Sequence, residues 1–231
     1  MLPDKTMKIV ALLEQRRYEE AEAELRMLAA TSPEDGPLHG LRALCLLELE
    51  EWHEALAAAR RATLRGPEVA YCHWALATVR IRCHEFRKAR VAAAKAVRLD
   101  PDTADYQYVL ARAEAADAHW QAALAALDRA VQLEPGRAAY LSLHAVIIEH
   151  RDGRVGPSGD LLAVLKQDPE DTIARAGRGW AALHEQPAHT TAVAVAPSAP
   201  RPLSVAGMFT SLVSRWLSRW LRPRSARRKA A

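Results

Sequence analysis

The 231-residue sequence contains no asparagine, only 6% aromatic residues and only three cysteines. Alanine, leucine, arginine and glutamate are abundant instead, which favours helices, while turns lose one of their usual polar residues. The cysteines, Cys45, Cys72 and Cys83, are too few and odd in number for a disulfide framework. We therefore expect an all-α protein of the reducing cytoplasm.

Long apolar segments are absent as well. No stretch reaches the roughly 18 uncharged apolar residues that a membrane-spanning helix needs. The only apolar run near the N-terminus, Ile9 to Leu13, is too short for the core of a signal peptide and has no cleavage site. These absences predict a chain that is neither exported by the usual route nor integral to a membrane.

Acidic residues are missing from the last part of the chain. Glu185 is the last of them, and eight of the 32 lysines and arginines follow it. Residues 1–185 carry 24 basic and 28 acidic residues, a formal net charge of −4, while the remainder carries +8. An acidic fold argues against nucleic-acid binding, because phosphate contacts need basic side chains along their path. The end of the chain, in contrast, is strongly basic.

Prolines recur on a lattice with a constant spacing of 34 residues, at Pro33, Pro67, Pro101, Pro135 and Pro169. An aromatic residue precedes each of the first four by fifteen residues, and small or aliphatic residues recur at three further lattice positions. The aromatic residues are Tyr18, Trp52, Phe86 and Trp120, and the alanines twelve residues before the prolines are Ala21, Ala55, Ala89 and Ala123. A period of this length is typical of repeat architectures.

This pattern predicts two amphipathic helices of about 13 residues in every repeat, packed antiparallel. The small residues mark the closest helix crossings. The aromatic residue opens the second helix and fills the wedge between the pair. The proline fixes the turn into the next repeat, because it disfavours a helical conformation of the residue before it.

Residues 2–169 resemble the tetratricopeptide repeat family, in its bacterial type. The resemblance rests on the small residues, the aromatic residue and the closing proline of each unit. The resemblance implies a right-handed α-solenoid of helix-turn-helix repeats. We expect five 34-residue units and a capping helix, at about 171–185, within residues 1–186. A linker rich in proline and alanine at 187–202 and a basic amphipathic tail at 203–231 complete the predicted organisation.

Two departures from the family pattern are present. The tryptophan expected early in each first helix is absent, and the residues at those positions are Lys5, His39, His73, Gln107 and Leu141. The fifth unit is degenerate, because residues 151–159 replace the start of its second helix. That helix is expected to begin near Pro157, since proline is tolerated in a first turn.

The resemblance also implies an inner face lined by the first helix of each unit. In the middle units this face carries aromatic residues and arginines, the usual anchors of a binding patch. The predicted peptide-binding residues are Tyr71, Trp74, Thr78, Arg82, Tyr108 and Arg112, and Asp105 is expected on the same face. Trp74 and Tyr108 occupy the same repeat position, so we expect them side by side. The alternative is that Tyr71 and Trp74 only pack between repeats.

Other kinds of site have little support. Family members that hold the carboxylate end of a chaperone tail need an inward asparagine, and this sequence has none. The pairs Cys72-His73 and Cys83-His84 stand eleven residues apart, about 16 Å along one helix, which is too far for a shared metal. No serine or cysteine nucleophile has a recognisable partner. We expect no catalytic residues, no metal, no cofactor and no small-molecule substrate.

The tail has a helical period between residues 203 and 221, with two tryptophans on its apolar side and arginines beside it. The predicted docking residues are Phe209, Leu212, Arg215, Trp216, Arg219 and Trp220. Such a helix suits the surface of an anionic membrane. Two alternatives are docking on the repeats or on a partner protein, and an unstructured tail or one acquired by out-of-frame coding.

These features predict a non-catalytic adaptor in the cytoplasm that binds a protein segment in the groove of its solenoid and reaches the inner membrane through its tail. The alternative is an assembly or regulatory subunit that builds a larger complex through its outer faces. In that case the tail docks on a partner or is disordered. An RNA-binding helical repeat is disfavoured by the acidic charge of the repeats.

Overall fold

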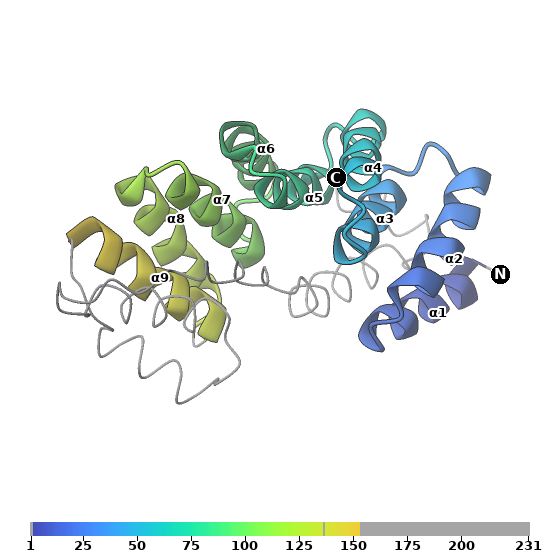
Figure 1. The fold of residues 1–231 in the computed structure, drawn as a ribbon, viewed down its shortest axis with the longest axis horizontal. Helices are drawn as coiled ribbons and strands as arrows, with labels where there is room; N and C mark the ends of the chain where they lie inside the picture. The colour runs from blue at the N-terminus through green and yellow to red at the C-terminus, as the bar shows by residue number, and fades with distance from the viewer. Residues whose placement is uncertain (1, 136, 153–231) are drawn as a thin grey trace, which may run out of the picture. The chain divides into compact units, whose positions relative to one another are not determined.

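The computed structural model describes residues 2–135 and 137–152, and these residues form helices joined by short turns, with no strand among them (Figure 1). They fall into two compact units, with the boundary between Cys83 and His84. The second helix of the fifth repeat, the capping helix at 171–185, the linker at 187–202 and the tail at 203–231 lie outside the described residues. These parts of the predicted organisation remain predictions.

In the first unit the described helices are α1 (Leu2–Glu14), α2 (Tyr18–Thr31), α3 (Gly36–Glu48), α4 (Trp52–Arg65) and α5 (Ala70–Arg82). Helix α2 packs against α1, and α4 packs against α3. Helix α5 lies against both α3 and α4, so each repeat packs on the next one (Figure 1).

In the second unit the described helices are α6 (Phe86–Leu99), α7 (Ala104–Ala116), α8 (Trp120–Leu133) and α9 (Ala138–Asp152). Helix α7 packs against α6 and α8, and α9 packs mainly against α8. Helix α9 is the first helix of the degenerate fifth repeat. No helix in the described part of the chain is long and apolar enough to cross a membrane.

The predicted register of the repeat is confirmed. Each aromatic residue of the lattice is the first residue of a second helix, at Tyr18, Trp52, Phe86 and Trp120. The first helices α3, α5, α7 and α9 begin 34 residues apart, and the paired helices are 13 and 14 residues long. The four aromatic side chains are half-buried, as expected for rings that lie between helices.

The small residues of the lattice form the core, as predicted. Their side chains are buried at Ala21, Ala55, Ala89 and Ala123, and again at Ala43, Ala77 and Ala111, all with 0% exposure. Since alanine carries only a methyl group, the helix backbones approach closely at these points. A larger side chain there has no space to occupy.

The turn inside each repeat has a recurring backbone conformation. Arg16, Glu50, His84 and Ala118 have positive φ angles between 58° and 62°, again 34 residues apart. In the turns at 15–17, 49–51 and 117–119, the next residue donates a hydrogen bond to the carbonyl five residues before it, over 2.9 Å. This is the left-handed helix ending in which glycine is most common. None of the four residues is glycine, so this turn left no glycine signal in the sequence.

The joints between repeats contain Pro33, Pro67, Pro101 and Pro135, each in a turn between two helices. At three joints the proline carbonyl accepts a hydrogen bond from a side chain six residues later, at the position where the family tryptophan was expected. The bonds run from His39 to Pro33 (3.0 Å), from His73 to Pro67 (2.8 Å) and from Gln107 to Pro101 (3.2 Å). A polar contact therefore ties the start of each of these first helices to its joint.

Candidate functional site

Three of the predicted contact residues form a packed layer on α5 in the first unit. Tyr71, Trp74 and Thr78 are each no more than 1% exposed, and the rings of Tyr71 and Trp74 lie 5.4 Å apart between centroids. The Thr78 hydroxyl donates to the carbonyl of Trp74 over 2.9 Å, within its own helix. These side chains are therefore buried in the structure and lie below the surface of the predicted inner face of α5.

Tyr71 also packs between repeats, which is the alternative that the sequence left open for it. A Cβ atom added to Gly40 of α3 would lie 3.0 Å from the Cε1 atom of Tyr71. That distance is shorter than an ordinary van der Waals contact, so the ring occupies space that only a glycine leaves. The contact between α3 and α5 thus depends on a glycine in one repeat and a tyrosine in the next.

Arg82 lies at the end of α5, where its guanidinium stands 5.2 Å from the centroid of the Trp52 ring. Trp52 is the residue that opens α4, so the arginine crosses from one repeat to the aromatic residue of the preceding one. A cation over an indole ring is attracted to it by about 0.5–1 kcal/mol at a partly exposed site. The ring holds Arg82 in place while its side chain remains partly exposed.

In the second unit, Tyr108 and Arg112 stand one turn apart on α7. The Tyr108 ring is buried and lies 5.0 Å from the ring of Tyr140 on α9. The Arg112 guanidinium lies 5.8 Å from the Tyr108 centroid, and its side chain is partly exposed. Within the described residues, no carboxylate forms an ion pair with Arg112. It is a partly exposed cation held on an aromatic ring.

Beside Tyr108 lies a buried ion pair that the sequence did not predict. The carboxylate of Asp105 accepts hydrogen bonds from Arg137, over 2.7 Å, and from the hydroxyl of Tyr140, over 3.0 Å. Burial, and then Asp105, raises the pKa of Tyr140, so the phenol keeps its proton and donates. Removing one partner of such a pair typically costs about 3–5 kcal/mol. Arg137 is therefore committed to the fold, unlike Arg112.

Trp74 belongs to the first unit and Tyr108 to the second, so their side-by-side arrangement remains a prediction. The predicted docking residues of the tail, from Phe209 to Trp220, lie outside the described residues. The structure thus brings together two sets within single units, one around Trp74 on α5 and one around Tyr108 on α7.

The buried cysteines are chemically quiet. Burial, and then Asp35, raises the pKa of Cys72 to about 12. Burial also raises the pKa of Cys45 far above its usual range, with a smaller contribution from Glu22 and Glu48. Both thiols stay protonated near neutral pH, and a protonated thiol is a poor nucleophile and metal ligand. In the described part of the chain, no group of three or more histidine, cysteine or acidic side chains has a metal-binding arrangement.

A family model for the tetratricopeptide repeat matches residues 6–71 of the chain. Residues 6–71 therefore match the tetratricopeptide repeat family, and the described helices have the fold of solved members. The matched segment runs from α1 to the start of α5, and the same 34-residue period continues to α9. No curated protein matches the sequence.

Solved structures of tetratricopeptide repeat proteins share this fold. A thermophilic member from Thermus thermophilus matches with a TM-score of 0.64 and 20% identity, over 78% of this chain and 98% of the other. MamA from Desulfovibrio magneticus, from residue 41 to its end, matches with a TM-score of 0.56 and 18% identity, over 73% and 98%. YrrB, described as a tetratricopeptide repeat protein with an unusual peptide-binding site, matches with a TM-score of 0.55 and 16% identity, over 74% and 89%.

Proposed function

We propose that this tetratricopeptide repeat protein is a non-catalytic scaffold that binds a segment of a partner protein on the faces of its first helices. The six predicted peptide-binding residues take two roles in this proposal. Tyr71, Trp74, Thr78 and Tyr108 are buried and fix the shape of the faces. Arg82 and Arg112 are partly exposed and contact the partner.

The observation that carries the proposal is the position of Arg112. A guanidinium has five N–H donors and matches a carboxylate or a backbone carbonyl. Its contact with the Tyr108 ring orders the side chain before a partner arrives, which lowers the entropy lost on binding. The description of YrrB as peptide-binding supports a peptide as the class of partner for this fold.

The test is capture of partner proteins by the full chain, compared with the same chain carrying Arg112→Ala. Arg61 of α4 is also an exposed arginine, so Arg61→Ala is the matched control. We expect Arg112→Ala to lower the affinity for a captured partner by about 2 kcal/mol or more, roughly thirtyfold, and Arg61→Ala to leave it unchanged. Equal affinity of both variants, with helical spectra and melting unchanged, would overturn the proposal.

We also propose that the tail brings the scaffold to an anionic membrane surface. The support comes from the sequence of residues 203–231, where two tryptophans and a series of arginines follow a helical period. Tryptophan side chains bury at the interface, and each basic residue near anionic lipid contributes about 1 kcal/mol.

Vesicle co-sedimentation of the full chain, with neutral and anionic lipid at two salt concentrations, tests the role of the tail. We expect binding to anionic vesicles that weakens with salt and is lost when Trp216 and Trp220 are changed to serine. Failure of the wild-type chain to co-sediment would leave the alternatives, which are docking of the tail on a protein and a tail without a function.

A further inference from the structure

Helix α6 differs in charge from the other second helices of the described chain. It carries five basic residues and no acidic residue, whereas α2 carries four acidic residues and one basic residue. The basic residues of α6 are Arg87, Lys88, Arg90, Lys95 and Arg98. Because residues 1–185 as a whole are acidic, this concentration of positive charge on one helix is a local feature.

Four of these basic residues share one face of α6. The alanines of the helix that face the core are Ala89, Ala92, Ala93 and Ala96. On the opposite side, within an arc of about 100° at 100° per residue, lie the residues that we name the α6 stripe: Arg87, Lys88, Val91, Lys95 and Arg98. The stripe is about 16 Å long at the rise of an α-helix.

An apolar side chain stands in the middle of this stripe. Val91 is 66% exposed, one of the few large apolar side chains of the described chain that face solvent. Its neighbours one turn away on the helix surface include Arg87, Lys88 and Lys95. A single exposed valine is common, but one surrounded by cations has the composition of a binding patch, with an apolar centre and a charged border.

Only part of the stripe suits the helix dipole. Arg98 lies in the last turn, where the dipole favours a basic residue, but the first two charges lie at the opposite end. Lys88 is paired there with Glu85 over 2.8 Å. Arg87 and Lys88 lie in the first turn, where the helix dipole favours acidic residues by about 0.3–1 kcal/mol each. Helix α2 follows the usual rule, because Glu19 and Glu20 occupy its first turn. Local rules of this kind are broken most often where a residue has a functional role.

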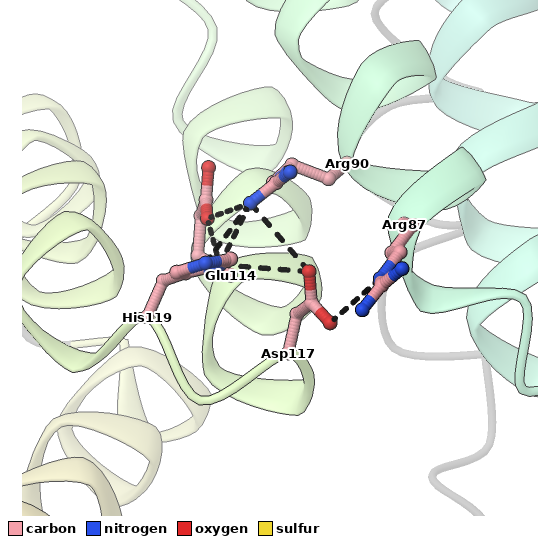
Figure 2. Close-up of polar contacts among 5 residues, drawn as sticks. All are labelled: Arg87, Arg90, Glu114, Asp117 and His119. Atoms are coloured by element: carbon pink, nitrogen blue, oxygen red, sulfur yellow. Dashed lines mark hydrogen bonds and ion pairs between the residues drawn. The ribbon is translucent and has the colours of Figure 1, made fainter.

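Helix α7 and the turn that follows it anchor the first part of α6 from one side, and Figure 2 shows the contacts. Arg90 lies 3.6 Å from a carboxylate oxygen of Glu114 and 3.5 Å from one of Asp117. Arg87 reaches Asp117 over 3.8 Å, yet its side chain remains 88% exposed. His119 adds a contact with Arg90 over 2.7 Å. These contacts order the arginines without covering Arg87.

Arg98 stands at the far end of the stripe. Arg98 is exposed, and it forms no ion pair with any residue that the structure describes. The stripe therefore presents a charge fixed at one end by α7, an apolar centre, and an open cation at the other end.

From this arrangement we infer that the α6 stripe docks an acidic segment of a partner protein, with an apolar side chain of that segment covering Val91. Charge complementarity selects this occupant. The basic tail of the chain itself is excluded, because its net charge has the same sign as the stripe. A lipid surface requires a larger apolar face than one valine. The stripe lies on a second helix, so the inference is independent of peptide binding by the first helices.

The experiment measures binding of a defined probe to the full chain. The probe is a fluorescein-labelled amphipathic peptide of about four helical turns, in which leucine recurs at helical spacing and glutamate fills the other positions. Its binding is measured by fluorescence anisotropy. The stripe variant is Lys95→Glu with Arg98→Glu. The matched control is Arg60→Glu with Arg61→Glu, an equal change of charge at two exposed arginines of α4. The basic tail is present in all three proteins, so its contribution is the same in each.

We expect the stripe variant to weaken probe binding about tenfold at low salt and the control to change it less than about twofold. Val91→Ser should weaken binding of the probe in high salt as well, because the apolar contact persists where the charges are screened. Equal affinities of the stripe variant and the control, with both proteins shown to be folded by circular dichroism, would overturn the inference. A larger loss for an RNA oligonucleotide or for anionic vesicles than for the peptide would also overturn it, in favour of that other ligand.

Discussion

The Nε2 atom of His73 donates a hydrogen bond to the carbonyl oxygen of Pro67, over 2.8 Å. The same bond recurs in the preceding and following repeats, where the donors are His39 and Gln107. Histidine and glutamine have different shapes, but each places an N–H group at a similar distance from the backbone. The position therefore requires a hydrogen-bond donor that reaches the joint, and this donor stands where the family has tryptophan.

This contact makes His73→Gln and His73→Leu an informative pair. The glutamine should keep the free energy of unfolding within about 0.5 kcal/mol of wild type, because it can donate the same bond. The leucine should lower it by about 1 kcal/mol, the usual net contribution of one hydrogen bond. Denaturant melts followed by circular dichroism measure both, with His53→Leu at an exposed position of α4 as the control. Similar losses for glutamine and leucine at residue 73 would show that the ring itself is needed.

The left-handed turn predicts opposite effects for the same substitution at two alanines. Ala118 has a φ angle of 59°, which costs an alanine about 1 kcal/mol relative to glycine. Ala118→Gly should therefore stabilise the protein by about 0.5–1 kcal/mol. Ala125→Gly, at an exposed position inside α8, should destabilise it by about 1 kcal/mol. Thermal melts of the two variants test this, and a loss of stability at both positions would contradict the turn geometry.

The repeat core predicts a contrast between two adjacent alanines of α8. Ala123 is 0% exposed at a helix crossing, while Ala122 is exposed. Ala123→Leu should lower the free energy of unfolding by about 1–3 kcal/mol through overpacking, and Ala89→Leu should behave alike. Ala122→Leu is the control and should change it by less than about 0.5 kcal/mol. A melting temperature unaffected by leucine at both Ala89 and Ala123 would mean that the crossings lie elsewhere.

The register of the fold could be predicted from the sequence because it is carried by residues that repeat. Proline ends a unit, an aromatic residue opens the second helix, and alanine marks each crossing, so one lattice located both helices of a repeat. The left-handed turn could not be found in this way. Its four residues share a conformation and no common side chain, and none is the glycine that would have indicated it.

The candidate site was harder to predict, because its contacts join different repeats. The sequence placed Arg82 among the contact residues, but it does not encode that Trp52, thirty residues earlier, lies beneath it. The pairing of Asp105 with Arg137 was missed for the same reason. One signal was available: Asp105 is an acidic residue on a largely apolar face, and a buried carboxylate needs a cationic partner.

Thiol reactivity tests the burial of the cysteines. Because burial raises the pKa of Cys72 to about 12 and raises that of Cys45 further, both should remain unreactive in the folded chain at mildly alkaline pH. Cys83 is partly exposed and should react with Ellman's reagent. We expect one fast thiol per native chain and three in guanidinium chloride. The control is Cys83→Ser, in which the fast reaction should disappear, and two or more fast thiols in the native wild type would contradict the packing.

The same raised pKa has a consequence for stability. The unfolded thiol has a pKa of about 8.5, so the contribution of a protonated Cys72 is complete below that pH. It is lost progressively as the pH rises from about 8.5 toward 12, because only the unfolded chain releases the proton there. Denaturant melts from neutral pH to about pH 10 should show stability falling above about pH 8.5, and Cys72→Ala should reduce that slope. An unchanged slope would assign the pH dependence to other groups.

Binding of a protein segment by the first-helix faces is tested most directly by site-specific photo-crosslinking. A benzophenone amino acid replaces Ala116, an exposed residue of α7 one turn from Arg112, or Arg61, on the exposed side of α4, and the protein is irradiated with cell extract. Arg112 stays in place in both proteins. We expect position 116 to give adducts whose mass spectra map to one continuous segment of a partner protein, and position 61 to give none. Adducts from position 61 together with none from position 116 would contradict peptide binding by the first helices.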